Sequence, residues 1–147
     1  RRPARTGGKN LCINLQSILA RLRLTDRAAV ARLAEPLPWH RQGEHDALES
    51  PISEHPLWWE EYHGPCFRLY VDYVTSAAQV MGWTLNQNTR NALHSLEGLL
   101  RTAKDLTSSF RLNAGESIWI NNWVYAHARE AFRDEGHGRH LIRTWHT

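Results

Sequence analysis

The sequence predicts a mainly β protein of the double-stranded β-helix (jelly roll) class with inserted helices, or the C-terminal part of such a fold. Short runs of alternating polar and apolar residues lie beside glycine turns near both ends of the chain, at residues 11–15 and 117–120. Such runs are typical of half-buried strands. Between them, apolar residues recur at helical spacing. No internal repeat or low-complexity tract interrupts this order.

Length and composition bound the function only loosely. A chain of 147 residues is long enough for one domain with a hydrophobic core. Its 18 Lys and Arg residues are interspersed with 15 Asp and Glu residues, for a formal net charge of +3. This balance favours a small anionic ligand, or no particular partner, over a nucleic acid. We expect neither a membrane span nor a signal peptide, because no apolar run is long enough for the first and no matching pattern opens the sequence.

Two cysteines, Cys12 and Cys66, are too few for a disulfide framework. We interpret both as buried free thiols. Thiols of this kind are typical of a reducing compartment, so the expected location is the cytoplasm.

The first predicted elements are a turn, a strand and two helices. Gly7-Gly8 predicts a flexible turn before the strand at residues 11–15. Residues 16–23 show a short helical pattern. Thr25-Asp26 suits the N-cap of a second helix, whose apolar face ends before Pro36.

The polar, proline-containing stretch at residues 37–56 is predicted to be a loop. It holds six residues of types that can bind metals: His40, His45, Asp46, Glu49, Glu54 and His55. No pair among them has His-x-Asp or His-x-Glu spacing, so we interpret them as solvated side chains of a loop.

Aromatic residues gather in the middle of the chain, at Trp58 and Trp59. Their presence predicts packing in the core or under a lid; alternatively, they form a pocket wall that holds a cationic ligand group by cation–π attraction. Residues 67–74 then alternate like a strand. The longest helix is expected to begin at Thr84 or Asn86 and to carry an apolar stripe that packs on the sheet.

The C-terminal stretch predicts strands around a turn at Ala114-Gly115. A run that begins at Trp123 carries His127 to the end of one strand, and residues 140–145 form another. Arg139 and Arg143, four residues apart, would share a face of an extended strand.

One imidazole and two guanidiniums would therefore converge from neighbouring strands. A neutral imidazole is a good ligand for iron or zinc, and a guanidinium binds a carboxylate through two parallel hydrogen bonds. The pattern suits a metal ion beside a dicarboxylate.

This segment resembles the C-terminal signature of the Fe(II)- and 2-oxoglutarate-dependent oxygenases of the taurine dioxygenase, clavaminate synthase and γ-butyrobetaine hydroxylase kind. The family pattern is a glycine turn, an apolar strand, Asp-Asn, a histidine five residues later and Arg-x-x-x-Arg. The matching residues here are Gly115, Asn121-Asn122, His127, Arg139 and Arg143. Asn121 stands where the family usually has Asp. The resemblance spans roughly residues 7–146 and implies the same jelly-roll fold.

The resemblance also implies roles in binding Fe(II) and 2-oxoglutarate. His127 would be the distal iron ligand, and Arg139 would hold the C5 carboxylate of 2-oxoglutarate. Asn10, which follows the Gly-Gly turn, would be a second cosubstrate contact; the alternative is that an Asn stands there because it tolerates a turn conformation. Arg143 would either assist the cosubstrate or hold an anionic end of the substrate.

The reaction implied is hydroxylation or desaturation of a small molecule by O2, with oxidative decarboxylation of 2-oxoglutarate to succinate. Trp58, Trp59, Asp72 and Asn122 are candidate substrate contacts, and they favour an amino-acid-like or amine compound. For Asp72, a surface carboxylate is the alternative. We expect no nucleic-acid or membrane partner.

The other two iron ligands of the family, in a His-x-Asp/Glu motif, precede the Gly-Gly turn, and that motif occurs nowhere in the 147 residues. We therefore expect residues 1–147 to be the C-terminal part of one oxygenase domain. Two other classes stay open. One is a non-catalytic, cupin-like binding domain, and the other is a halogenating relative in which Gly or Ala replaces the iron carboxylate.

Overall fold

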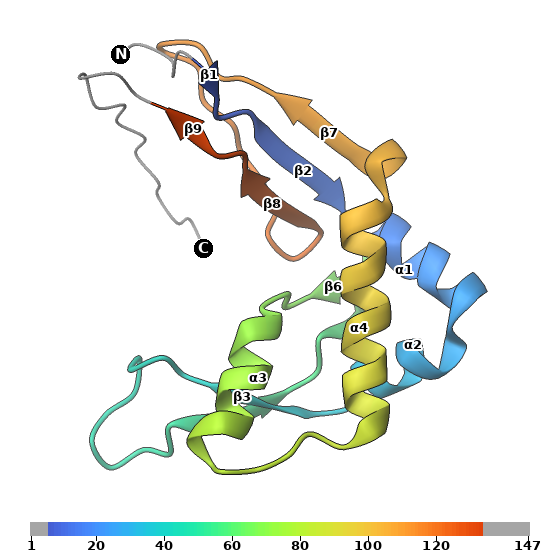
Figure 1. The fold of residues 1–147 in the computed structure, drawn as a ribbon, viewed down its shortest axis with the longest axis vertical. Helices are drawn as coiled ribbons and strands as arrows, with labels where there is room; N and C mark the ends of the chain where they lie inside the picture. Colours follow the sequence, from blue (N-terminus) through green and yellow to red (C-terminus); the bar gives the residue numbers. More distant parts are fainter. Residues whose placement is uncertain (1–5, 134–147) are drawn as a thin grey trace.

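The computed structural model describes residues 6–133, in which four α-helices and short antiparallel strands alternate along the chain (Figure 1). The helices are α1 (Leu15–Thr25), α2 (Arg27–Leu33), α3 (Val71–Val80) and α4 (Gln87–Thr102), with a 3-10 turn η1 (Lys104–Leu106). The strands are β1 (Thr6–Gly7), β2 (Asn10–Asn14), β3 (Leu37–His40), β4 (Ile52–His55), β5 (Trp58–Glu61), β6 (Gly64–Phe67), β7 (Thr107–Phe110), β8 (Tyr125–Arg129) and β9 (Phe132–Arg133).

The largest sheet within residues 6–133 has three antiparallel strands in the order β7-β2-β8. Strands β1 and β9 pair beside it, and two separate hairpins, β3–β4 and β5–β6, complete the sheets of the described residues. These sheets are small and none of them closes on itself. Because helical residues also outnumber strand residues here, the expectation of a mainly β chain is not met: the described part is a mixture of helices and antiparallel strands. The jelly roll remains a prediction.

The core lies between α1, α2 and α4, which run side by side (Figure 1). Helix α1 begins at Asn14, whose Oδ1 accepts hydrogen bonds from the N–H groups of Gln16 (2.8 Å) and Ser17 (3.2 Å). Such a cap satisfies donors that the first helical turn leaves without partners. The predicted apolar stripe of α4 is confirmed, because Ala92, Leu93 and Leu96 are buried in this core.

Asp26 joins all three helices. Its backbone N–H donates to Leu22 of α1, its Oδ1 accepts from the N–H of Ala29 (2.9 Å), and its Oδ2 accepts from Ser95 Oγ of α4 (2.7 Å). Both side-chain contacts are hydrogen bonds to the ionised carboxylate, so they lower the pKa of Asp26, the bond from Ala29 most of all. The predicted N-cap is thereby confirmed.

We expect the substitution Asp26→Ala to lower the free energy of unfolding at neutral pH by about 1–3 kcal/mol, since it removes a cap and an interhelical hydrogen bond. Because the pKa of Asp26 is lowered on folding, this contribution is present above the ordinary Asp pKa and is lost as the pH falls through the folded-state value. Urea unfolding at a series of pH values measures it. Asp46→Ala, in an exposed loop, is the control and should change little; an equal loss in both variants would contradict the assignment.

Three predicted elements differ in the structure. Residues 37–56 form the hairpin β3–β4 rather than a loop, because Leu37 and Trp39 are buried and anchor the two strands. Residues 67–74 do not continue as a strand: β6 ends at Phe67, and α3 starts at Val71 so that Val74 and Ala77 pack inward at helical spacing. Residues 117–120 carry no strand, and both edges of β2 are already occupied by β7 and β8.

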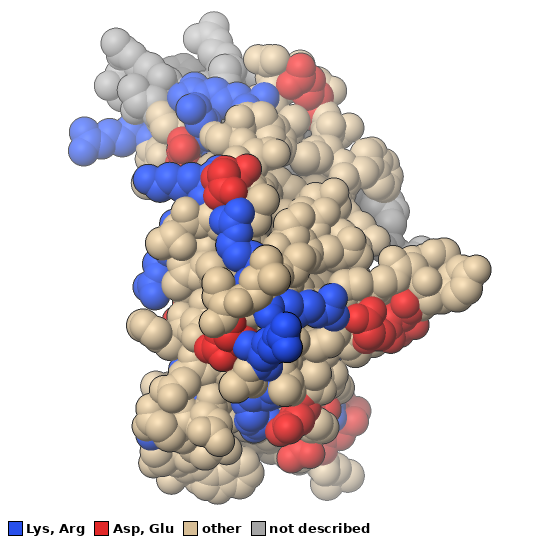
Figure 2. Space-filling view, turned by 90° about the vertical axis from the view of Figure 1, so that its right-hand side faces the viewer, with Lys and Arg blue, Asp and Glu red and all other residues tan. Residues whose placement is uncertain are grey.

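Charges of both signs are interspersed on the face shown in Figure 2, as the sequence suggested. Both cysteines are free thiols; Cys66 is buried and Cys12 is half-buried. Over the residues described, none of the helices has the length and apolar character needed to cross a bilayer.

Candidate functional site

The register of the three-stranded sheet places two of the predicted site residues on one face. In β2, Asn10 pairs with Arg129 of β8, and Cys12 pairs with His127. Residues that pair across antiparallel strands point to the same side of the sheet, and so do residues two apart in one strand. Asn10 and His127 are therefore diagonal neighbours on a common face, with Cα atoms roughly 7–8 Å apart.

Asn10 carries a free donor on this face. It is half-buried, and its Nδ2 atom is buried without a hydrogen-bond partner in residues 6–133. A buried polar group of this kind costs about 1–3 kcal/mol unless something satisfies it. Asn10 lies in the strand β2 and does not have a positive φ, so the turn explanation for an Asn at this position does not apply. An amide donor here fits a carboxylate oxygen.

The turn before Asn10 requires glycine. Gly7 has a φ of +67°, and a Cβ atom on it would lie 2.1 Å from the carbonyl oxygen of Ala131. The N–H of Gly8 donates to the same oxygen (3.2 Å), and the N–H of Glu130 donates to Lys9 O (3.0 Å). The Gly-Gly turn thus holds the start of β2 against the segment that follows β8.

The segment before His127 is a hydrogen-bonded turn. Oδ1 of Asn121 accepts from the N–H of Trp123 (2.9 Å), and its carbonyl accepts from Val124 and Tyr125. Because only an acceptor oxygen is used, Asn fulfils here the same local role that Asp could. Asn122 is half-buried in this turn. Strand β8 begins at Tyr125, so His127 lies in the middle of the strand; its predicted place at a strand end is wrong.

Cys12, directly opposite His127, was not singled out by its sequence context. Burial raises the pKa of its thiol, which favours the protonated form. Arg129 lies on the same face and its guanidinium stacks over the Phe132 ring at 4.1 Å. The sequence could have placed Arg129 on the face of His127, because residues two apart in a strand point to the same side of the sheet.

The described residues contain no group of three or more His, Cys, Asp and Glu side chains arranged to hold a metal. Within residues 6–133, His127 therefore does not belong to such a group, and a complete iron site needs further ligands. The predicted Arg139 and Arg143 lie outside the described residues. The fit to the implied cofactors is thus partial: an unsatisfied amide suits 2-oxoglutarate, and one of three iron ligands can be named.

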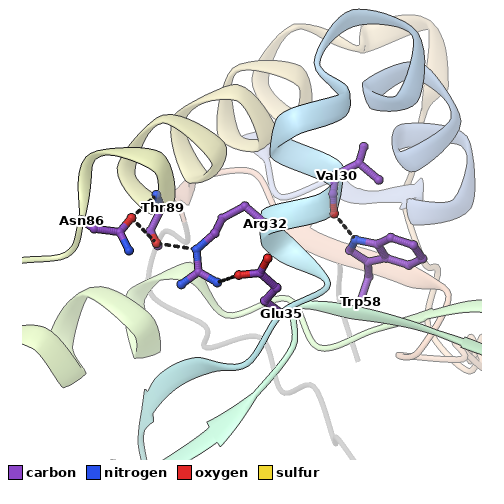
Figure 3. Close-up of polar contacts among 6 residues, drawn as sticks. All are labelled: Val30, Arg32, Glu35, Trp58, Asn86 and Thr89. Carbon is purple, nitrogen blue, oxygen red and sulfur yellow. Dashed lines mark hydrogen bonds and ion pairs between the residues drawn. The ribbon is translucent and has the colours of Figure 1, made fainter.

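The aromatic candidates have partners within the protein. Trp58 Nε1 donates to the carbonyl of Val30 in α2 (2.9 Å), as Figure 3 shows, and Arg23 lies 5.3 Å above the Trp58 ring. The cation next to the Trp58 ring in the structure is thus an arginine of α1. Trp59 donates to Glu61 Oε1 (2.8 Å) and lies edge-on to Trp123.

A neighbouring polar network joins α2 to α4. Arg32 Nε donates to Thr89 Oγ1 (2.8 Å), while Arg32 pairs with Glu35 (2.8 Å); Thr89 in turn is held by the N-cap Asn86 (Figure 3). These contacts are structural. Asp72 is exposed in the first turn of α3, distant in the chain from the sheet face of His127.

An amide that follows a Gly-Gly turn and lies beside a histidine on one sheet face is the arrangement that the resemblance to Fe(II)- and 2-oxoglutarate-dependent oxygenases predicts. The sequence model of the family described as "Taurine catabolism dioxygenase TauD, TfdA family" matches residues 1–145. The chain belongs to this family, whose members are dioxygenases that use Fe(II) and 2-oxoglutarate. No curated protein gives a significant match to the chain.

Proposed function

We propose that this chain provides the distal iron ligand and the cosubstrate contacts of an Fe(II)- and 2-oxoglutarate-dependent dioxygenase. The observation that carries the proposal is the shared sheet face of Asn10, with its unsatisfied amide, and His127. Membership of the family supports the same chemistry.

In this proposal, each residue has a defined task. His127 would bind iron through an imidazole nitrogen, because iron prefers neutral imidazole and carboxylate ligands in such sites. Arg139 would bind the C5 carboxylate of 2-oxoglutarate, and Asn10 would be a second contact that donates a hydrogen bond to the cosubstrate. When bound, iron and 2-oxoglutarate supply the oxidation of a C–H bond at the expense of the keto acid. The remaining ligands come from a His-x-Asp/Glu motif outside residues 1–147, which form the C-terminal part of the oxygenase domain.

The proposed substrate is a small amino-acid-like or amine compound that is hydroxylated or desaturated. Asp72, exposed at the start of α3, offers a carboxylate to an amine, and Arg143 would take an anionic end.

We expect Asn10→Ala in the complete protein to raise the KM for 2-oxoglutarate by about tenfold or more, because a hydrogen bond to a charged group contributes about 1.5–3 kcal/mol. The free energy of unfolding should hardly fall, since the amide has no partner within the described protein. Steady-state succinate formation and urea unfolding measure the two effects. Ser108→Ala, on the neighbouring strand β7 and paired with Cys12, is the matched control. An unchanged KM, or a loss of stability equal to that of a core variant, would contradict this role.

A further inference from the structure

A groove of about 430 Å³ lies between the hairpin β3–β4 and the segment that leads into α3. Its volume falls within the range of about 300–1,000 Å³ that is usual for small-molecule sites. Strand β3 lies away from the sheet β7-β2-β8 (Figure 1), whereas the segment that leads into α3 follows β6, where the N–H of Phe67 donates to the carbonyl of Trp123 (2.8 Å) just before β8. None of the residues that line the groove belongs to the site of Asn10 and His127, and two of them, His40 and His55, are histidines that the sequence pattern assigned to a solvated loop.

One wall of the groove is aromatic and fixed in place. Trp39 is 3% exposed, and its Nε1 donates to the carbonyl of His55 (2.8 Å) across the hairpin. Tyr73 meets Trp39 edge-on with ring centroids 6.2 Å apart, and Tyr70 stacks on Tyr73 at 4.9 Å. Since these rings hold one another, they present a preformed apolar surface to a planar group.

Two arginines, Arg41 and Arg68, also line the groove. The guanidinium of Arg68 lies 5.9 Å from the centre of the Trp39 ring and has no carboxylate partner in the part of the chain that the structure describes. Arg41 pairs with Glu49 through one nitrogen (2.9 Å), while its Nε atom is buried without a hydrogen bond within those residues. Guanidinium N–H groups without a hydrogen-bond partner in the described residues suit a carboxylate, which accepts two parallel hydrogen bonds.

His55 lines the same groove as these two arginines. Burial lowers its pKa most, and the positive charges of Arg68 and Arg41 lower it further. The imidazole is therefore neutral at physiological pH and can donate or accept a hydrogen bond at the groove. The acidic side chain that also lines the groove is Glu44, which is exposed.

We propose that this groove binds a small aromatic carboxylate, at a site separate from that of 2-oxoglutarate. The carboxylate contacts Arg68 and the buried Nε of Arg41, and the ring packs against Tyr70 and Tyr73. Both features are needed, because the cations alone would accept any anion and the rings alone any flat molecule. This inference does not depend on the proposed dioxygenase activity.

The test is a titration of the complete protein with benzoate. Calorimetry and the NMR signal of the Trp39 indole N–H monitor the binding. Benzoate should bind and shift that signal, and the uncharged analogue benzamide should bind at least about tenfold more weakly. Arg68→Gln should weaken benzoate binding by about tenfold or more, and Arg41→Gln should act in the same direction. Arg101→Gln, an exposed arginine of α4, should leave it unchanged.

Saturating 2-oxoglutarate should leave benzoate binding intact if the two sites are distinct. The proposal is overturned by any of four results: no binding at millimolar benzoate, equal binding of benzamide, an Arg68→Gln variant that is folded by circular dichroism yet binds normally, or displacement of benzoate by 2-oxoglutarate. The last result would place benzoate in the oxygenase site. Loss of dioxygenase activity in an Arg139 variant tests only the proposed dioxygenase function and not the binding of benzoate in the groove.

Discussion

Replacement of Arg139 by alanine in the complete protein is expected to raise the concentration of 2-oxoglutarate needed for half-maximal activity by more than about a hundredfold. A guanidinium that binds the C5 carboxylate in a site closed to water forms two charge-assisted hydrogen bonds. Truncating one partner of such a buried pair costs about 3–5 kcal/mol, because the other charge is left without compensation. Succinate formation as a function of 2-oxoglutarate concentration measures the effect.

Two further variants make this test specific. Arg143→Ala should impair binding of the primary substrate more than binding of 2-oxoglutarate; the reverse pattern would exchange the roles of the two arginines. Arg27→Ala, an exposed residue at the start of α2, should leave both constants unchanged. If the 2-oxoglutarate dependence of the Arg139 variant equals that of the wild type, the assignment of the cosubstrate contact is refuted.

The second large effect is expected from His127→Ala, which should weaken Fe(II) binding in the complete protein by more than about a hundredfold and abolish product formation. Even residues that only orient a metal ligand are worth about 10- to 100-fold in affinity, so loss of a direct ligand should exceed that range. Anaerobic titration with Fe(II) in the presence of 2-oxoglutarate reports binding through the charge-transfer absorption of the chelated keto acid. His94→Ala, an exposed histidine of α4, is the matched control.

The same titration tests where the other ligands come from. Residues 1–147 alone should bind Fe(II) weakly, because a single imidazole lacks the affinity of several ligands held together. Charge-transfer absorption at stoichiometric iron in that isolated chain would show that further ligands lie within it. The histidines between His40 and His63 would then be the first to replace. Activity in the complete protein also separates the dioxygenase from a non-catalytic, cupin-like domain.

Features with a local physical cause were predictable from the sequence. The N-cap at Asp26 and the apolar stripe of α4 depend on residues three or four positions apart, and both are confirmed. The Gly7-Gly8 turn was predictable for the same reason, since its φ values are a property of the residues themselves. The family was likewise carried by spacings along the chain, from Gly115 to His127 and onward to Arg143.

Elements whose conformation depends on distant partners were not predictable. Residues 71–74 carry β-branched side chains that suit a strand, but burial of Val74 against the hairpin β3–β4 selects a helix. Strands β3 and β4 are separated by a long loop, so no turn signal revealed their pairing. For that reason, the sequence did not predict the groove that these strands form with Tyr73. The residues around His55 were not predictable either.

By itself, the sequence determined the family, the glycine turn and the identity of His127 as the candidate iron ligand, because these follow from residue type and spacing. It could not decide that Asn10 and His127 share a face, since strand order and register are set by packing between segments more than a hundred residues apart. Only the tertiary structure placed Cys12 opposite His127, left the amide of Asn10 without a partner, and engaged Trp58 with Arg23 and Val30 inside the protein. Each of these depends on which side chains compete for the same hydrogen bonds and the same space, and that competition exists only once the chain has folded.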